Sequence, residues 1–178
     1  MTTTKELTQR NAAFTTHGFN PHLTINPRGN MMVVGCVDPR VDPAHVLGLD
    51  NGEAAIIRNV GGRITPSTLR TMIMLGKVGQ ANADTHVPGT WNLVILHHTD
   101  CGMTDLGPYP DLLADYFEIS EDELAGKSIA DPQGSVRVDV ETILTNLRGS
   151  DFLVSGLVYD VTTGYLQVIV PPTALPLA

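Results

Sequence analysis

The chain has 178 residues, of which 42% are hydrophobic, and its 19 acidic against 11 basic residues give a formal charge of −8. This length and hydrophobic content suit one folded domain and exclude intrinsic disorder, while the negative charge excludes a surface that binds nucleic acid or anionic membrane. No apolar run approaches the roughly 20 residues of a membrane helix, and the N-terminus lacks a signal peptide's apolar stretch. We therefore expect a cytoplasmic protein with no nucleic-acid or membrane partner.

Short apolar runs that suit buried strands recur along the chain. They are residues 31–37, 54–57, 93–96, 152–159 and 165–170. The second run leads into a glycine-rich turn at residues 58–62, and the third leads directly into the segment from His97 to Cys101. The last two runs flank a short polar turn, a pattern that indicates a β-hairpin.

Helical patterns separate these runs. Thr65 and Pro66 have the residue types of an N-cap and a first helical position, and apolar residues follow at helical spacing. Residues 80–90 are polar and interrupted by proline and glycine, so we expect a loop there. Asp139 is expected to cap another helix, because apolar residues share one face after it: Val140, Ile143, Leu144 and Leu147. We interpret residues 78–126, with nine acidic and no basic residues, as a solvated face with an insertion.

Strands that alternate with helices predict an α/β fold. We expect a mainly parallel central sheet with helices on both faces and an antiparallel edge strand from the C-terminal hairpin. Ligands of such sheets bind in the crevice beyond the carboxyl ends of the strands. Three polar segments follow predicted strands and should meet there: Cys36 to Arg40, Arg58–Asn59 and His98 to Cys101.

The only two cysteines, Cys36 and Cys101, each lie at the end of a predicted strand, and Cys101 follows His98 in a His-x-x-Cys turn. Two sulfurs and one imidazole suit Zn²⁺, and three protein ligands with an open fourth position are typical of a catalytic rather than a structural site. Two inert core cysteines are the plainer alternative. A disulfide is disfavoured in a reducing compartment, and His97 should face the opposite side of its strand from His98.

Asp38 lies two residues after Cys36, so in an extended segment both side chains share a face, and Pro39 favours that extended geometry. Arg40 is close enough to hold Asp38 in a bidentate ion pair, although a plain salt bridge in a turn would look the same. Two thiolates neutralise the charge of Zn²⁺ and weaken it as a Lewis acid. A carboxylate fixed beside the metal-bound water could then orient it for attack on an electrophilic carbon.

In this order, three motifs resemble those of the β-carbonic anhydrases. They are Cys36-x-Asp38-x-Arg40, Arg58-Asn-x-Gly-Gly62 and His98-Thr-Asp-Cys-Gly102. The resemblance implies one Zn²⁺ per chain, held by Cys36, His98 and Cys101, with Asp38 and Arg40 as a catalytic dyad. It also implies reversible hydration of carbon dioxide to bicarbonate by attack of zinc-bound hydroxide.

The resemblance further implies a homodimer or a dimer of dimers, in which an N-terminal helix, here about residues 5–15, embraces the partner. The single domain, residues 1–178, would then comprise an N-terminal arm at residues 1–28, an α/β core at residues 29–171 and a tail at residues 172–178. The glycine-rich turn does not indicate a nucleotide site, because no Gly-Lys-Ser/Thr follows it.

Two alternatives to carbon dioxide hydration remain. Relatives in the same family hydrolyse carbonyl sulfide or carbon disulfide, and the ligand and dyad motifs do not separate these substrates from carbon dioxide. A non-catalytic zinc-binding dimer is the other alternative, but a purely structural site has no use for the pair of Asp38 and Arg40.

Overall fold

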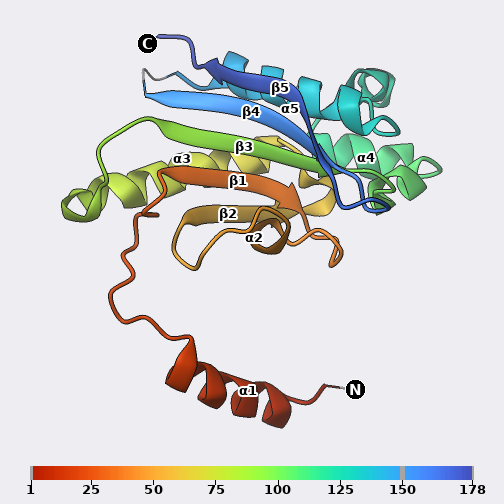
Figure 1. The fold of residues 1–178 in the computed structure, drawn as a ribbon. Coiled ribbons are helices and arrows are strands. Elements are labelled where there is room, and N and C mark those ends of the chain that lie inside the picture. The colour runs from red at the N-terminus through yellow and green to blue at the C-terminus, as the bar shows by residue number, and fades with distance from the viewer. Residues whose placement is uncertain (1, 149–150, 178) are drawn as a thin grey trace.

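A five-stranded sheet organises the chain (Figure 1). The computed structural model describes residues 2–148 and 151–177. The strands are β1 (Met31–Cys36), β2 (Ala54–Asn59), β3 (Trp91–His98), β4 (Phe152–Tyr159) and β5 (Leu166–Ala174). Their order across the sheet is β2-β1-β3-β4-β5, with parallel pairing throughout except between β4 and β5, which form the antiparallel edge. The predicted fold class is confirmed.

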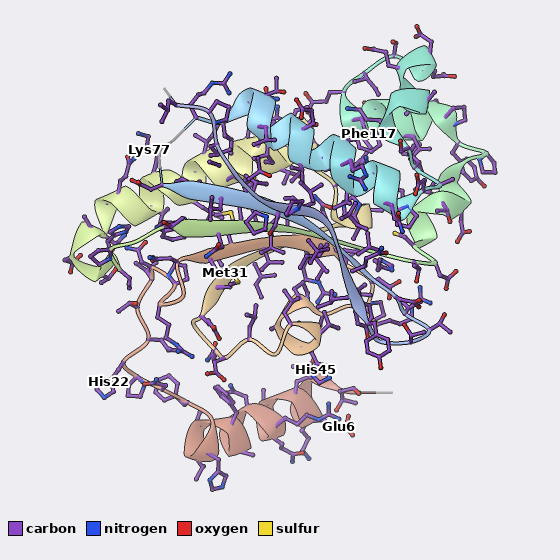
Figure 2. The ribbon with its side chains drawn as sticks, turned by 45° about the horizontal axis from the view of Figure 1, so that its top comes forward. Glu6, His22, Met31, His45, Lys77 and Phe117 are labelled. Carbon is purple, nitrogen blue, oxygen red and sulfur yellow. The ribbon has the colours of Figure 1, made fainter. Side chains whose placement is uncertain are left out.

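Helices and hydrophobic side chains cover both faces of this sheet. The α-helices are α1 (Thr4–His17), α2 (Pro43–Val46), α3 (Pro66–Ala81), α4 (Pro110–Phe117) and α5 (Pro132–Asn146). Helices α3 and α5 lie on one face, as Figure 2 shows, where Met72 and Ile143 pack with Val34 and Ile95 of the sheet. The short α2 and the segment after it cover part of the other face around Val33. No helix within the described ranges is long and apolar enough to span a membrane.

The prediction that a helix starts at Asp139 is wrong, although the helix itself is present. Helix α5 begins at Pro132, and its N-cap is Asp131, whose carboxylate accepts a hydrogen bond from the backbone of Gln133. The apolar spacing that followed Asp139 was genuine, but the preceding two turns also belong to the helix because Asp131 and Pro132 supply its cap and first position. Asp139 is therefore mid-helix, and it is buried.

The C-terminal strand is longer than the apolar pattern predicted. Strand β5 continues through Pro171 and Pro172 to Ala174, past the expected end of the core at residue 171. Proline lacks a backbone N–H, but an edge strand has one side without a hydrogen-bonding neighbour and tolerates it. The pairing of β4 with β5 also carries a register irregularity around Gly156, which shifts the later residues of β5.

The acidic segment between β3 and α5 has a small hydrophobic core of its own. It contains α4 and two 3-10 helices, η3 (Gly102–Leu106) and η4 (Glu121–Lys127). Met103, Leu113 and Phe117 are buried together there. The expected solvated face is thus only its outer side, because these apolar residues are buried. Helix α4 lies near the end of the sheet where β3 finishes (Figure 1).

Helix α1 stands away from the sheet (Figure 1). Its bounds, Thr4–His17, are close to the predicted residues 5–15, and it starts with a capping box in which Thr3 and Glu6 satisfy each other's backbone N–H groups. None of its described residues is buried, and Leu7 and Phe14 are exposed. An isolated helix of this length is marginal in water, so α1 needs a packing surface that one chain does not provide.

Candidate metal centre

Three predicted ligands meet at the carboxyl edge of the sheet. Cys36 is the last residue of β1 and His98 the last residue of β3, and Cys101 lies in the turn that follows β3. Because β1 and β3 are parallel neighbours, their ends share one edge. One potential ligand atom from each residue lies within 4.8 Å of those of the other two, and the two sulfurs are 3.9 Å apart.

The donor set fits a zinc ion. Two sulfurs held 2.3 Å from a tetrahedral ion would be about 3.8 Å apart, close to the observed separation. His98 donates from Nδ1 to the carbonyl oxygen of Thr99 at 2.9 Å, which leaves Nε2 as the metal-binding nitrogen. That Nε2 is buried and has no hydrogen-bond partner among the described residues. A buried imidazole nitrogen without a partner is costly unless it binds an ion.

The two thiols are electrostatically unequal. A hydrogen bond from the thiol of Cys101 lowers the pKa of Cys36 to about 4, whereas donation to Cys36 and burial raise the pKa of Cys101. One proton shared between two sulfurs accounts for both directions. Because a metal takes thiolates and not thiols, binding would displace this remaining proton from Cys101.

A glycine turn allows the backbone to pass close beneath the cluster. Gly61 and Gly62, in the 3-10 turn η1 (Val60–Gly62) after β2, both have positive φ angles, of +76° and +67°. A Cβ atom on Gly62 would lie 2.9 Å from the backbone nitrogen of Cys36. Only glycine combines this conformation with such an approach, so these glycines allow the turn to pack closely against the site.

Asp38 and Arg40 form the expected bidentate ion pair. Nη2 of Arg40 donates to Asp38 Oδ2 at 2.7 Å, and its Nε lies 3.1 Å from Oδ1. The hydrogen bonds from Arg40 lower the pKa of Asp38 to about 2, so this carboxylate is ionised at neutral pH. Asp38 Oδ2 is also 3.9 Å from Nε2 of His98, so the carboxylate faces the unpartnered nitrogen of the cluster.

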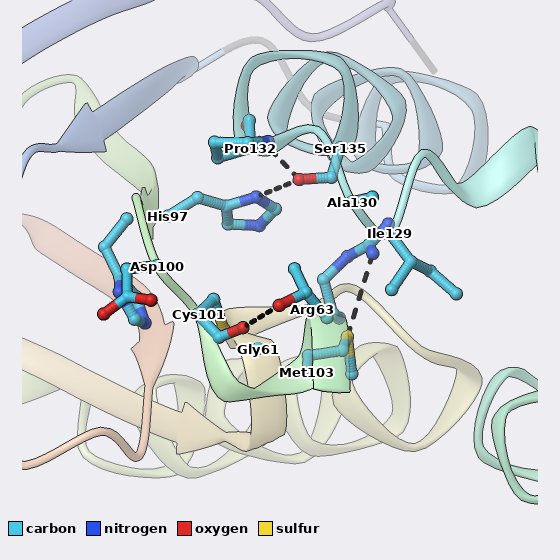
Figure 3. A pocket seen from close by; sticks show the side chains of 12 residues that line it. Gly61, Arg63, His97, Asp100, Cys101, Met103, Ile129, Ala130, Pro132 and Ser135 are labelled. Atoms are coloured by element: carbon cyan, nitrogen blue, oxygen red, sulfur yellow. Dashed lines mark hydrogen bonds between the residues drawn. The ribbon is translucent and has the colours of Figure 1, made fainter. Parts of the chain in front are cut away.

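His97 belongs to a different, buried network, as its opposite orientation on β3 predicted. Its Nδ1 lies 2.8 Å from the hydroxyl of Ser135, a contact that Figure 3 shows, and its Nε2 lies 3.1 Å from a carboxylate oxygen of Asp139. Arg63 pairs with Asp139 at 2.7 Å, and both side chains are only 2% exposed. Its guanidinium also donates to the carbonyl of Lys127.

This network borders the metal centre. A cavity of about 60 Å³ separates them, lined on one side by Cys101 and Gly61 and on the other by His97 and Ser135 (Figure 3). Sequence reasoning missed Arg63 and Asp139, because 76 positions separate them and no local pattern marks their pairing. Through Arg63, helix α5 and the glycine turn beneath the candidate metal ligands are connected.

We expect Asp139→Asn to destabilise the protein by about 3–5 kcal/mol, because it leaves the buried Arg63 charge without its partner. For a chain of this size that corresponds to a melting temperature lower by roughly 6–20 °C in calorimetry. The exposed Glu141 on the same helix provides the control, since Glu141→Gln should change stability by less than about 0.5 kcal/mol. An Asp139→Asn variant as stable as this control would show that Asp139 does not stabilise the buried charge of Arg63.

The pair of Arg63 and Asp139 also makes the stability of the protein depend on pH. Burial alone would raise the pKa of Asp139, but the contact with His97 and the charge of Arg63 lower it overall. A carboxyl whose folded pKa is depressed stabilises the protein above its unfolded pKa and loses that contribution as the pH falls through the folded value. The loss of unfolding free energy in Asp139→Asn should therefore be complete at neutral pH and become smaller only in strong acid. Urea unfolding of the variant and the wild type across this pH range measures it.

Comparison with known proteins agrees with this geometry. The family model described as "Carbonic anhydrase" matches residues 31–115, the segment that contains all three candidate ligands. "Beta-carbonic anhydrase 1" of Mycobacterium tuberculosis is 29% identical over 96% of this chain and 100% of its own length. The crystal structure of a carbonic anhydrase from Streptococcus mutans superposes with a TM-score of 0.69 at 28% identity, covering 95% of this chain and 98% of that chain.

A second activity occurs among the relatives. The "Carbon disulfide hydrolase" of Acidianus sp. is 34% identical over 73 residues, which are 41% of this chain and 31% of that protein. This match is shorter than the match to the mycobacterial protein, which extends over nearly the whole chain.

Proposed function

We propose that this chain is a member of the β-carbonic anhydrase family, which its similarity to the carbonic anhydrases supports, and that it catalyses the reversible hydration of carbon dioxide to bicarbonate at a zinc ion held by Cys36, His98 and Cys101. The observation that carries the proposal is an ionised carboxylate, Asp38, aimed at a three-ligand cluster that contains an unpartnered imidazole nitrogen. A structural zinc site would be closed by a fourth protein ligand and would not need this carboxylate.

Asp38 and Arg40 have different roles in the proposed reaction. When bound, zinc supplies the Lewis acidity that makes water nucleophilic near neutral pH. Asp38 accepts a hydrogen bond from the attacking water molecule and so directs an oxygen lone pair toward the carbon of the substrate. Arg40 keeps Asp38 ionised and oriented through its bidentate contact. The attack forms one C–O bond while the π electrons of one C=O bond move onto its oxygen, and one O–H bond of the water breaks; bicarbonate is released and the proton leaves to solvent.

The match to a carbon disulfide hydrolase makes carbon disulfide and carbonyl sulfide the second candidate substrates. Both are linear and have the same electrophilic carbon, so the same residues would act on them. The test is to measure kcat/KM for carbon dioxide, carbonyl sulfide and carbon disulfide on one zinc-quantified preparation. We expect carbon dioxide to exceed the other two by a wide margin, and the reverse order would replace the proposed substrate.

Assembly and location belong to the same proposal. A second copy would give α1 the surface it lacks here, since its described residues are all unburied and include exposed Leu7 and Phe14. A homodimer or a dimer of dimers is therefore proposed, to be checked by light scattering. We also propose a cytoplasmic location, because a reducing compartment keeps Cys36 and Cys101 available as metal ligands.

A further inference from the structure

Asp100 is an acidic residue of the metal-ligand turn to which sequence reasoning gave no role. It lies between His98 and Cys101 with a φ of +52°, in the left-handed region that non-glycine residues seldom occupy. Aspartate tolerates this conformation better than most residues, although glycine would adopt it without strain. Its presence here raises the question of what the carboxylate does.

The carboxylate and the carbonyl of Asp100 both bind Arg40. Nη1 of Arg40 donates to Asp100 Oδ2 at 2.7 Å, and Nη2 donates to the Asp100 carbonyl oxygen at 2.8 Å. Asp38 occupies the adjacent Nε–Nη2 edge of the same guanidinium. The left-handed backbone at Asp100 is thus accompanied by two acceptors directed at one end of Arg40.

This arrangement connects two separate segments of the site. Asp38 and Arg40 are two residues apart on the segment after β1, so their own ion pair does not determine where the pair lies relative to the turn after β3. That turn carries Cys101 and begins at His98. The side chain of Arg40 connects the two segments by donating to both the carboxylate and the backbone carbonyl of Asp100, which lies 60 positions further along the chain.

Stability alone does not explain the contact. The side chains of Arg40 and Asp100 are 48% and 77% exposed, and ion pairs with this exposure contribute little to folding. The contact can matter for the reaction rate instead, because a displacement of about 1 Å in a reacting group can reduce a rate by about 100-fold.

We propose that Asp100 is a positioning residue for hydration: it anchors Arg40 to the metal-ligand turn and thereby keeps the Asp38 carboxylate directed at the metal centre. The inference rests on the proposed function of the site. It assigns to Asp100 no contact with substrate and no role as a metal ligand.

The test uses Asp100→Gly in the zinc-loaded, full-length protein, because glycine preserves the left-handed backbone and removes only the carboxylate. We expect kcat to fall about tenfold with KM, zinc stoichiometry and melting temperature unchanged. The kcat of Asp100→Asn, whose amide oxygen still accepts a neutral hydrogen bond, should lie between that of Asp100→Gly and that of the wild type. In parallel, ¹⁵N relaxation of the Arg40 Nε–H group should show greater mobility in Asp100→Gly than in the wild type.

Glu118 supplies a matched control. It is also an acidic residue at positive φ, +54°, and pairs with an arginine, Arg70, at 2.8 Å, but it lies at the end of α4. Glu118→Gly should leave kcat and the mobility of Arg40 unchanged, so a loss specific to Asp100→Gly would not reflect strain relief or charge removal in general.

Several outcomes would overturn the assignment. They are wild-type kcat in Asp100→Gly, an Arg40 Nε–H group as rigid as in the wild type, or loss of zinc from the variant, which would make Asp100 part of the metal site itself. If Asp100→Ala is impaired while Asp100→Gly is normal, only the turn geometry matters. A wild-type protein that hydrates no carbon dioxide would refute the proposed function, while the mobility of Arg40 would still decide the role of Asp100.

Discussion

Cys101→Ser is expected to give a folded protein that retains little zinc and has lost nearly all carbon dioxide hydration. Loss of an outer partner of a metal ligand already weakens metal affinity by about 10–100-fold, so loss of a ligand should cost about 100-fold or more. A serine hydroxyl is a poor replacement, since thiolate is the ligand that this site offers to zinc. The measurement is zinc content by atomic absorption after dialysis, with the hydration rate on the same sample.

Chelation of the wild-type protein provides the control for this result. Treatment with a strong chelator should reproduce the variant's low activity, and added zinc should restore the wild type but not Cys101→Ser. The circular dichroism of the variant should match that of the chelated wild type, which separates metal loss from unfolding. Full zinc occupancy in Cys101→Ser would contradict the ligand assignment.

Asp38→Asn has the second large expected effect. The amide keeps the shape of the side chain but is a weaker hydrogen-bond acceptor and carries no charge, so hydration should fall roughly 100-fold or more while zinc remains bound. Because the pKa of Asp38 is about 2, the carboxylate does not titrate between pH 6.5 and 9. The variant should therefore lower the plateau of the pH–rate profile, while the rise of the rate with pH persists because Asp38 is not the group that titrates there.

Asp50 gives the comparison variant for Asp38. It also pairs with an arginine, Arg28, at 2.9 Å, but on the exposed surface away from the cluster. Asp50→Asn should keep wild-type rates across the same pH range. An Asp38→Asn variant that stayed fully active, or whose profile moved instead of falling, would remove Asp38 from the catalytic step.

The meeting of the candidate metal ligands and the pairing of Asp38 with Arg40 could be predicted because they depend on local geometry. Cys36 and Asp38 are two apart in an extended segment that precedes a proline, and such residues share a face. His97 and His98 are adjacent on a strand, so one of them had to face away from the cluster. Parallel pairing of β1 with β3 then brings both strand ends to one edge, as expected.

The contacts of Asp139 and Asp100 could not be predicted from the sequence. Asp139 has the residue type of a helix cap, and only the three-dimensional packing of α5 over the turn at Arg63 shows that it is a buried ion-pair partner. Asp100 is part of a recognisable motif, but its left-handed backbone and its contact with Arg40 depend on how two strand ends are spaced. Long-range pairing of charges leaves no periodicity to detect.

We propose above that one zinc ion per chain, held by Cys36, His98 and Cys101, makes this protein a carbon dioxide hydratase. The most direct test is a stopped-flow titration in which metal-free protein receives zinc in steps and hydration is followed from about pH 6.5 to 9. We predict that the rate rises linearly with zinc, stops rising at one equivalent per chain and increases with pH. A rate that does not depend on zinc, or fully loaded protein that does not hydrate carbon dioxide, would contradict the account.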